Sequence, residues 1–325
     1  HRSGKFSPPL ALGKNPDGNA HRNPTLLIDE DGLLYVFYGY ASGNQPLHVL
    51  RSVAPYDITN WVKQTDVVPR AASYPQPWQL ESGKITVVYR VPKGWCCRTT
   101  GDGGRTWSHP ISIVEFSDYE FCSTAYAMTV AENGTFPRRI HLTWSKLGGG
   151  SPEEQRTKAL WARRYDVYYA CSDDGGSTWR RSDGAALSLP ITEADAEKVY
   201  ESGEHGVWLK DIQLDPAGNP CVLFIDADAH TYASTWKFAR NLGGAWSMSD
   251  IATSDHMYDG GALLLLADDD FRMYGPTKTV QKGCDGGEIV EWRSSDGGHT
   301  WHAGTSLTTG SQYSHNHVKA ARNQE

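Results

Sequence analysis

Apolar residues recur along this chain in short paired runs that are separated by tight, polar turns. In the first pair, at residues 26–38, Leu-Leu-Ile and Leu-Leu-Tyr-Val-Phe-Tyr flank the turn Asp-Glu-Asp-Gly. Short apolar runs bounded by turn residues are the pattern of a β-hairpin rather than of a helix. The pattern recurs at residues 78–90, 127–144, 212–224 and 263–274, the last copy being the weakest. The sequence therefore predicts an all-β fold.

A second pattern, Ser/Thr-x-Asp-x-Gly-x-Thr-Trp, follows three of these hairpins, at residues 100–107, 172–179 and 294–301. Asp favours the turn, the glycines adopt positive φ, and the Trp can fix the turn against a core. The pattern resembles the Asp-box of sialidase-like β-propellers, a turn that indicates a fold rather than a chemistry. Degenerate forms end at Trp61 and Trp246.

A hairpin with its closing strands makes a four-stranded sheet, and repeated sheets of this kind are the blades of a β-propeller. We therefore predict one β-propeller domain over residues 1–325, with about five blades visible. Residues 314–319 have the pattern of a further inner strand. We expect the chain to be clipped at one or both ends of a roughly seven-bladed ring, and a five-bladed ring is the alternative.

Charge and composition limit the partners. The chain carries 31 Lys and Arg against 38 Asp and Glu, a formal net charge of −7. Nucleic-acid binding needs clustered basic residues, so we expect no nucleic-acid partner. No apolar run approaches the ~20 residues of a membrane-spanning helix, so we expect no membrane partner. An acidic ligand would need a local cationic patch.

The chain has six cysteines. None forms a Cys-x-x-Cys pair, and six cysteines allow many pairings that the sequence does not distinguish. We expect buried free thiols, with one disulfide or a His/Cys metal site as the alternative. The cysteines are Cys96, Cys97, Cys122, Cys171, Cys221 and Cys284.

Candidate site residues stand where the inner strands begin, because those positions of a propeller share one cavity. His21, Tyr74 and Tyr126 precede the first three hairpins, and both residue types transfer protons. The alternative is that these rings only fill the channel wall. Arg90 ends the second hairpin directly after Val-Val-Tyr, where its donor fork suits a carboxylate, unless it is a surface residue at a strand end. The later hairpins open near His205 or Trp208 and near His256 or Tyr258.

Several of these segments resemble the propeller-type polysaccharide lyases that act on ulvan. The segment 21–32, which opens on His-Arg-Asn-Pro, is similar to the first blade of that family. The Tyr-Pro-Gln of residues 74–76, with the Tyr-Arg of residues 89–90 and the Asp-box, is similar to the second blade. Residues 207–212 and 258–261 resemble later segments, and the resemblance covers most of the chain in patches.

The resemblance implies β-elimination at a uronic acid, which leaves an unsaturated uronate end. Arg90, assisted by Asn23, would neutralise the carboxylate so that the C5 proton can be removed. His21 and Tyr74 would share the roles of base and acid, and which residue takes which role stays open. Three further aromatic residues would contact sugars, with core packing as the alternative for the two tryptophans: Tyr126, Trp78 and Trp208.

The expected protein is a secreted or periplasmic, monomeric polysaccharide lyase. Its substrate is an anionic polysaccharide, either ulvan or another rhamnose–glucuronate polymer. Some relatives carry a second His just after the first hairpin, where this chain reads Gly-Tyr-Ala-Ser-Gly, and His48 is not an obvious replacement. The chemistry requires no cofactor. A structural zinc or calcium stays open, since some relatives hold zinc through His and Cys; the candidate ligands in this chain are Cys171, Cys221 and His205.

Two other functions stay open. A sialidase-like propeller glycosidase needs paired carboxylates around the bond that it cleaves, and nothing in the sequence singles out such a pair. A non-catalytic carbohydrate-binding propeller would keep the fold and show no turnover.

Overall fold

The computed structural model of the chain consists of antiparallel β-sheets and one short helix in the residues that it describes. These are residues 8–13, 24–39, 46–70, 72–116, 122–149, 151–157, 163–228, 233–278 and 285–320. The chain divides into two compact units. Unit 1 is His1–Pro92 with Cys96–Pro110, and unit 2 is Lys93–Trp95 with Ile111–Glu325.

Unit 1 contains the first two predicted hairpins. Its first sheet has the strand order β1-β2-β3-β4, and its first hairpin sets Leu26 opposite Val36. In the second hairpin, β5 pairs with β6 and sets Trp78 opposite Thr86. The strands are β1 (Thr25–Ile28), β2 (Leu34–Tyr38), β3 (His48–Ser52), β4 (Trp61–Lys63), β5 (Ser73–Glu81), β6 (Lys84–Val91) and most of β7 (Gly94–Thr100).

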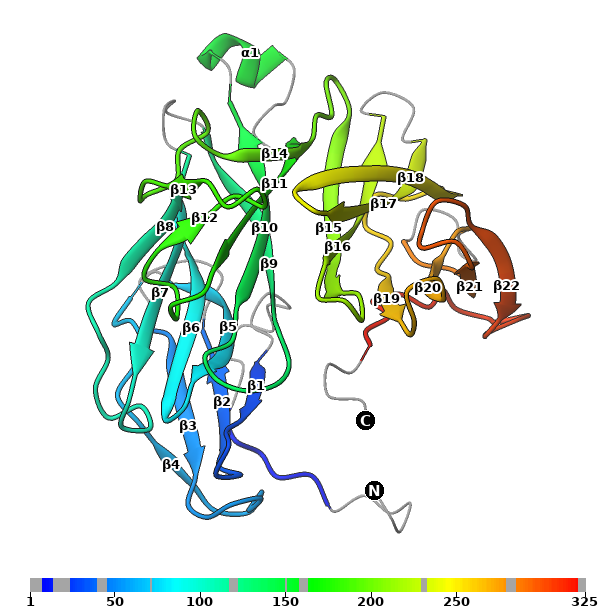
Figure 1. Ribbon diagram of the computed structural model, residues 1–325. Helices are drawn as coiled ribbons and strands as arrows, with labels where there is room; N and C mark the ends of the chain where they lie inside the picture. Colours follow the sequence, from blue (N-terminus) through cyan, green and yellow to red (C-terminus); the bar gives the residue numbers. More distant parts are fainter. Residues whose placement is uncertain are drawn as a thin grey trace. The chain divides into compact units, whose positions relative to one another are not determined.

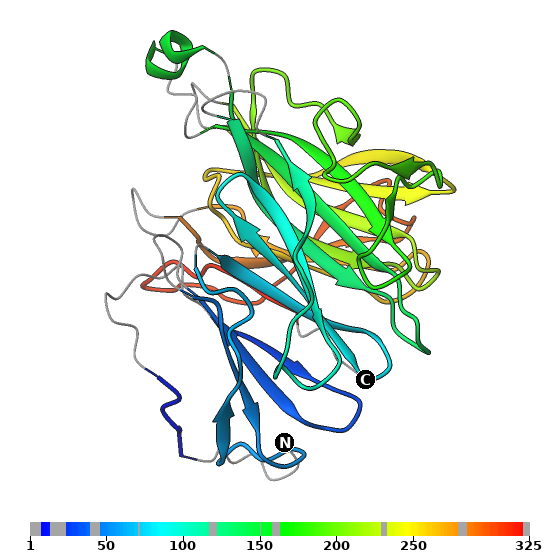
Figure 2. The ribbon, with the colours of Figure 1, turned by 90° about the vertical axis from the view of Figure 1, so that its left-hand side faces the viewer.

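Unit 2 contains the other three predicted hairpins. Two of its sheets are four-stranded, with the orders β15-β16-β17-β18 and β19-β20-β21-β22. In both sheets the strands follow one another in chain order, as the strands of a propeller blade do; Figure 1 labels them, and Figure 2 shows the same ribbon turned by 90°. They are β15 (Gly206–Leu214), β16 (Pro220–Ala227), β17 (Ser234–Leu242), β18 (Ala245–Ser254), β19 (Ala262–Leu265), β20 (Phe271–Pro276), β21 (Ile289–Ser294) and β22 (His302–Ser306). Strand β8 (Ile111–Glu115) also belongs to unit 2.

The remaining sheet of unit 2 departs from the predicted four strands. It has six strands, because β12 and β14 both pair with β11 and β13 pairs with β12. The segment between the second Asp-box and β15 supplies the short extra strands. The strands are β9 (Cys122–Ala131), β10 (Ile140–Gly148), β11 (Arg164–Ser172), β12 (Trp179–Arg180), β13 (Ala186–Leu187) and β14 (Glu197–Tyr200).

The helix α1 (Pro152–Thr157) lies between β10 and β11 and has six residues. Glu153 and Glu154 stand in its first turn, where negative charge favours a helix N-terminus. Throughout the ranges that the structure describes, no helix is long and apolar enough to cross a membrane.

Each unit has its own apolar core between neighbouring sheets. In unit 1, Phe37 of β2 and Val87 of β6 are fully buried in one cluster. In unit 2, Leu223 and Phe238 share a cluster with Phe271 of β20. Burying a large apolar side chain stabilises a fold by roughly 1.5–3 kcal/mol. The apolar faces of the predicted strands therefore hold neighbouring sheets together.

The three Asp-boxes form the turns that the sequence predicts. Asp102 accepts hydrogen bonds from the N–H and the hydroxyl of Thr106, at 2.9 and 2.7 Å. Asp174 and Asp296 make the same two contacts to the Thr four residues later. The two glycines after each Asp have φ between 70° and 97°, a region that glycine adopts readily. The boxes are therefore local turn devices and carry no site chemistry of their own.

The cysteines with described side chains fit the predicted buried thiols. Four have buried side chains: Cys96, Cys97, Cys171 and Cys221. Burial raises the pKa of the Cys171 and Cys221 thiols, which keeps them protonated and unreactive at neutral pH.

The C-terminal segment does not form the further inner strand that its pattern predicts. One isolated bridge joins Gly287 to His315, and residues 316–320 have no strand structure. The segment packs instead on the turn before β19, where the Gly260 N–H donates to Asn316 at 2.5 Å. A Cβ at Gly260 would lie 2.7 Å from the His317 Cα, so only glycine permits this approach.

Candidate functional site

In unit 1 the structure brings together two of the predicted catalytic residues. Tyr74 stands near the start of β5, and Arg90, near the end of β6, pairs across the ladder with Ser73. The Arg90 guanidinium carbon lies 5.8 Å from the centre of the Tyr74 ring. Both side chains are half-buried, and Arg90 makes no ion pair with a carboxylate of the described residues. Its charge is therefore available to a ligand.

The backbone at Tyr74 is unusual. From Ser73 to Gln76 strand β5 advances by three residues, while the paired positions in β6 advance by only two, so the ladder is irregular here. Tyr74 adopts a φ of 52°, a conformation that costs a bulky residue about 1–3 kcal/mol and that clusters at functional sites. A bulge of this kind redirects a side chain from the strand. The irregularity thus takes the Tyr74 side chain, beside Arg90, out of the regular alternation of the strand.

The other predicted residues of this part of the chain have different outcomes. His21 and Asn23 lie outside the described residues, so their roles stay predictions. Trp78 is half-buried and stands four residues after Tyr74, about 13 Å further along the strand. The Nδ1 of His48 lies 2.7 Å from the Asp66 carboxylate, so its ring is engaged with that side chain, in line with the expectation that it is not an obvious replacement for a second His.

In unit 2 two predicted sugar-binding residues gather around an arginine. The Arg164 guanidinium carbon lies 4.8 Å from the centre of the Tyr126 ring and 5.6 Å from that of Trp208. A third ring, Tyr258, lies 5.8 Å away. Trp208 is only 8% exposed, whereas Tyr258 is 46% exposed. Trp208 therefore supports Arg164 from inside, and Tyr126 and Tyr258 are the rings that a sugar could reach.

Bulges also mark the inner strands of unit 2. Strand β9 is irregular where Tyr126 stands, because Thr124 and Ala127 are three residues apart but pair with residues of β10 that are only two apart. Strand β15 holds one extra residue, Lys210, between Leu209 and Asp211. Bulges are frequent next to active sites because they re-aim side chains. The same device therefore appears at Tyr74, Tyr126 and Lys210.

Lys210 is a buried cation. Its Nζ donates to the Met257 carbonyl at 2.7 Å. Burial lowers the pKa of Lys210 to about 7; the Asp259 carboxylate opposes this, while Lys319 and Arg164 lower it further. The Asp285 carboxylate also raises this pKa, so burial outweighs two carboxylates at this ammonium.

Sequence reasoning missed Arg164 and Lys210 and did not choose between His256 and Tyr258. A signal existed for Lys210, because a lysine inside the apolar run Val-Trp-Leu-Lys-Asp-Ile is unusual in a buried strand. Arg164 begins the third strand of its sheet. The expectation that site residues stand at the starts of inner strands therefore did not include it.

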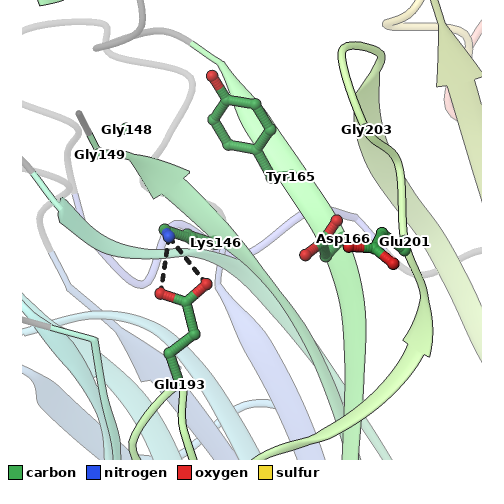
Figure 3. Close-up of a pocket in the computed structure, with 8 residues that line it drawn as sticks. All are labelled: Lys146, Gly148, Gly149, Tyr165, Asp166, Glu193, Glu201 and Gly203. Atoms are coloured by element: carbon green, nitrogen blue, oxygen red, sulfur yellow. Dashed lines mark hydrogen bonds and ion pairs between the residues drawn. The ribbon is translucent and has the colours of Figure 1, made fainter.

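A pocket of about 240 Å³ opens beside this region of unit 2 (Figure 3). The charged side chains that line it are already paired, one pair within the pocket and the others with Lys198 outside its lining. The Lys146 ammonium donates to both carboxylate oxygens of Glu193, at 2.8 and 2.6 Å. Asp166 accepts from the Ser202 N–H and pairs with Lys198 at 2.9 Å. The pocket therefore offers less to an anionic ligand than Arg164 does.

The three candidate metal ligands do not come together. Cys221 and Asp226 stand near opposite ends of β16, and the Nδ1 of His205 lies 2.5 Å from the Asp226 carboxylate. Five residues of strand separate Cys221 from that contact, about 17 Å. Across the described ranges no group of three or more His, Cys, Asp or Glu side chains is placed to hold a metal ion. Cys171, Cys221 and His205 therefore do not make one site.

Curated relatives with similar sequences are ulvan lyases. The chain is 24% identical over 336 residues to "Ulvan Lyase-PL25" of Pseudoalteromonas sp. (strain PLSV), covering 92% of this chain and 67% of the relative. It is 25% identical over 324 residues to "Ulvan lyase" of Alteromonas sp. (strain LOR), covering 88% and 63%. The chain thus spans about two thirds of the length of these relatives.

A solved structure of a PL25 ulvan lyase bound to -[GlcA(1-4)Rha3S]- superposes with a TM-score of 0.72 at 20% identity. The match covers 89% of this chain and 70% of the other. It confirms the predicted all-β, propeller-type fold. The sequence profile of the family described as "BNR repeat-containing family member" matches residues 6–254, more than half of the chain. The chain therefore belongs to the BNR repeat-containing family.

Proposed function

We propose that this chain is a polysaccharide lyase that cleaves ulvan, or another rhamnose–glucuronate polymer, by β-elimination. The observation that carries the proposal is the pair of Tyr74 and Arg90, whose guanidinium lies 5.8 Å from the tyrosine ring with no protein carboxylate of the described residues to neutralise it. The relatives named ulvan lyases support the same activity.

The reaction follows from the chemistry of a uronate. The proton on C5 is weakly acidic because it lies α to the carboxylate, and a cation beside that carboxylate stabilises the negative charge that develops when the proton leaves. Arg90 supplies this cation and binds the carboxylate through its donor fork. The enzyme uses the Arg90 guanidinium in place of a metal or an organic cofactor.

Two proton transfers complete the cleavage. A base takes the C5 proton, the electron pair forms the C4=C5 double bond, and the C4–O4 bond breaks. An acid then protonates O4 of the leaving chain. Tyr74 takes one of these roles and His21 the other, with Asn23 assisting Arg90 at the carboxylate.

The substrate also determines where the protein works. The fragment in the related solved structure alternates glucuronate with 3-sulfated rhamnose, and we take the same anionic repeat as the substrate here. A polymer of this kind is cleaved outside the cytoplasm, so the protein is secreted or periplasmic, and it acts as a monomer. In unit 2, Tyr126 and Trp208 belong to the substrate-binding surface.

The test compares two arginines of unit 1. Elimination creates a conjugated uronate that absorbs ultraviolet light, so the initial rise in absorbance on ulvan measures turnover. Arg90→Ala should lower kcat/KM by about 10²–10³-fold, the usual loss on removing one group that stabilises developing charge. Arg105 lies on the exposed surface of the first Asp-box, and Arg105→Ala is the matched control. Equal turnover in the two variants would contradict the proposal.

A further inference from the structure

The Arg164 guanidinium lies among aromatic rings rather than carboxylates in the described residues. Three aromatic rings surround the guanidinium at 4.8, 5.6 and 5.8 Å: Tyr126, Trp208 and Tyr258. Aromatic rings attract a cation through their faces and use none of its N–H donors. A guanidinium carries five such donors in its plane, in a geometry that matches an oxyanion. The rings therefore fix the orientation of Arg164 and leave its hydrogen-bonding capacity largely unused.

The contacts of Arg164 agree with this interpretation. Its Nε is buried and has no hydrogen-bond partner among the described residues. Its Nη1 reaches the Tyr258 hydroxyl only at 3.5 Å, which is long for a hydrogen bond. In the described part of the chain it makes no ion pair with a carboxylate. The Nε is covered by protein atoms, but Arg164 as a whole is only half-buried, so a bound anion would meet the exposed remainder of the guanidinium.

Nearby charges strengthen the attraction for an anion. Lys210 is buried beside this arginine, and the Lys319 ammonium approaches the Lys210 carbonyl at 3.3 Å. The carboxylate of Asp259 is engaged elsewhere, since it accepts from the Gly286 N–H at 2.7 Å and from Ser254. Lys210 and Lys319 therefore add positive charge near Arg164, while the nearby carboxylates of Asp259 and Asp285 accept hydrogen bonds from other groups.

The rings are also fixed in position. The Trp208 ring lies against the backbone of Gly206, where a Cβ would come within 2.4 Å of it. Trp208 meets Tyr258 edge to face, with ring centres 6.2 Å apart. The half-exposed Tyr258 ring leaves an apolar face toward solvent, which suits the apolar face of a sugar ring. The site combines a sugar platform with an anion receptor.

We propose that Arg164, framed by Tyr126, Trp208 and Tyr258 and backed by Lys210, binds the sulfate ester of a sulfated sugar in the substrate. This inference rests on the proposed function, in which Arg90 already binds the uronate carboxylate. The repeat of the proposed substrate carries one other anionic group, the sulfate ester on rhamnose. Its oxygens accept the paired N–H donors of Arg164, and its charge persists at every physiological pH.

The test measures binding rather than turnover. Calorimetric titrations use native ulvan, chemically desulfated ulvan and carboxyl-reduced ulvan, all in a Tyr74→Phe background so that the polymer stays intact. Arg164→Gln should weaken binding of native ulvan at least about tenfold, the effect of losing a charge-assisted hydrogen bond. It should leave the binding of desulfated ulvan unchanged.

Arg138 provides the matched control. It stacks on Phe136 at 4.4 Å in an exposed turn of the same unit, so Arg138→Gln removes a stacked arginine without touching the site. Tyr258→Ala, at a half-exposed ring, is the second site variant if Arg164→Gln fails to fold, and it should also weaken binding of the native polymer selectively.

Each outcome decides the inference. Equal loss of binding for native and desulfated ulvan would overturn it. A loss that disappears only with carboxyl-reduced ulvan would also overturn it, because Arg164 would then bind the uronate. If no ulvan is cleaved yet Arg164→Gln removes sulfate-dependent binding, the proposed activity fails and this inference stands. If cleavage proceeds and Arg164→Gln changes nothing, only the inference fails.

Discussion

Replacement of Tyr74 by Phe isolates one oxygen atom. The ring stays, so its contact with the Arg90 guanidinium at 5.8 Å and the positive φ of 52° are both preserved. What the variant loses is the hydroxyl that gives or takes a proton in the elimination. Tyr74→Phe therefore separates a chemical role of this residue from a packing role.

The expected magnitudes differ between activity and stability. Loss of a general acid or base lowers turnover by about 10²–10⁴-fold. That is about 3–5 kcal/mol in activation free energy, at about 1.4 kcal/mol for each factor of ten. The free energy of unfolding should change by no more than about 1 kcal/mol, since the stacking of the ring on Arg90 is retained.

The assay follows the initial rise of ultraviolet absorbance on ulvan, with urea unfolding of the same preparations. Tyr56→Phe in the same unit is the matched control, since it also removes the hydroxyl of a tyrosine with positive φ, at an exposed position outside the predicted site. If Tyr74→Phe retained more than about a tenth of the turnover, Tyr74 would not transfer a proton, and the assignment from its place beside Arg90 would be refuted.

Three other predictions concern the fold. The pKa of Asp102 is lowered to about 2, mainly by the hydrogen bonds that it accepts from Thr106. The stability that ionised Asp102 gives the fold should therefore be complete above about pH 4 and lost as the pH falls to about 2. A difference in unfolding midpoint between the protein and Asp102→Asn that did not shrink over this range would contradict this. Gly206→Ala places a Cβ 2.4 Å from the Trp208 ring. It should weaken the binding of native ulvan and lower the free energy of unfolding in urea by about 1–3 kcal/mol. An unchanged affinity together with an unchanged free energy of unfolding would refute the contact. Arg240→Met leaves the fully buried Asp215 carboxylate without its cation. The free energy of unfolding in urea should fall by about 3–5 kcal/mol, and a fall of less than about 1 kcal/mol would be inconsistent with a buried ion pair.

The parts of the fold that local sequence determines were predictable. Five hairpins and three Asp-boxes form where the alternation of apolar residues and the turn residues indicate them. A turn such as that at Asp102 is stabilised within five residues, so its pattern is complete in the sequence. The short strands β13 and β14 were not predicted, because their pairing depends on neighbouring strands rather than on their own pattern.

The candidate site was predictable only in part. Tyr74 and Arg90 were found because they stand at the two ends of one hairpin, which the ladder necessarily brings together. The bulge that redirects Lys210 leaves no mark in the sequence, since it arises from the register of β15 against β16. Arg164 depends on rings from three other segments of the chain and could be recognised only in the structure.

The most direct test of the proposed activity is to incubate the protein with ulvan and follow ultraviolet absorbance and new reducing ends together. β-Elimination predicts that both signals rise in parallel, because each cleavage creates one conjugated uronate and one reducing end. New reducing ends without absorbance would show hydrolysis and contradict the roles assigned to Tyr74 and Arg90.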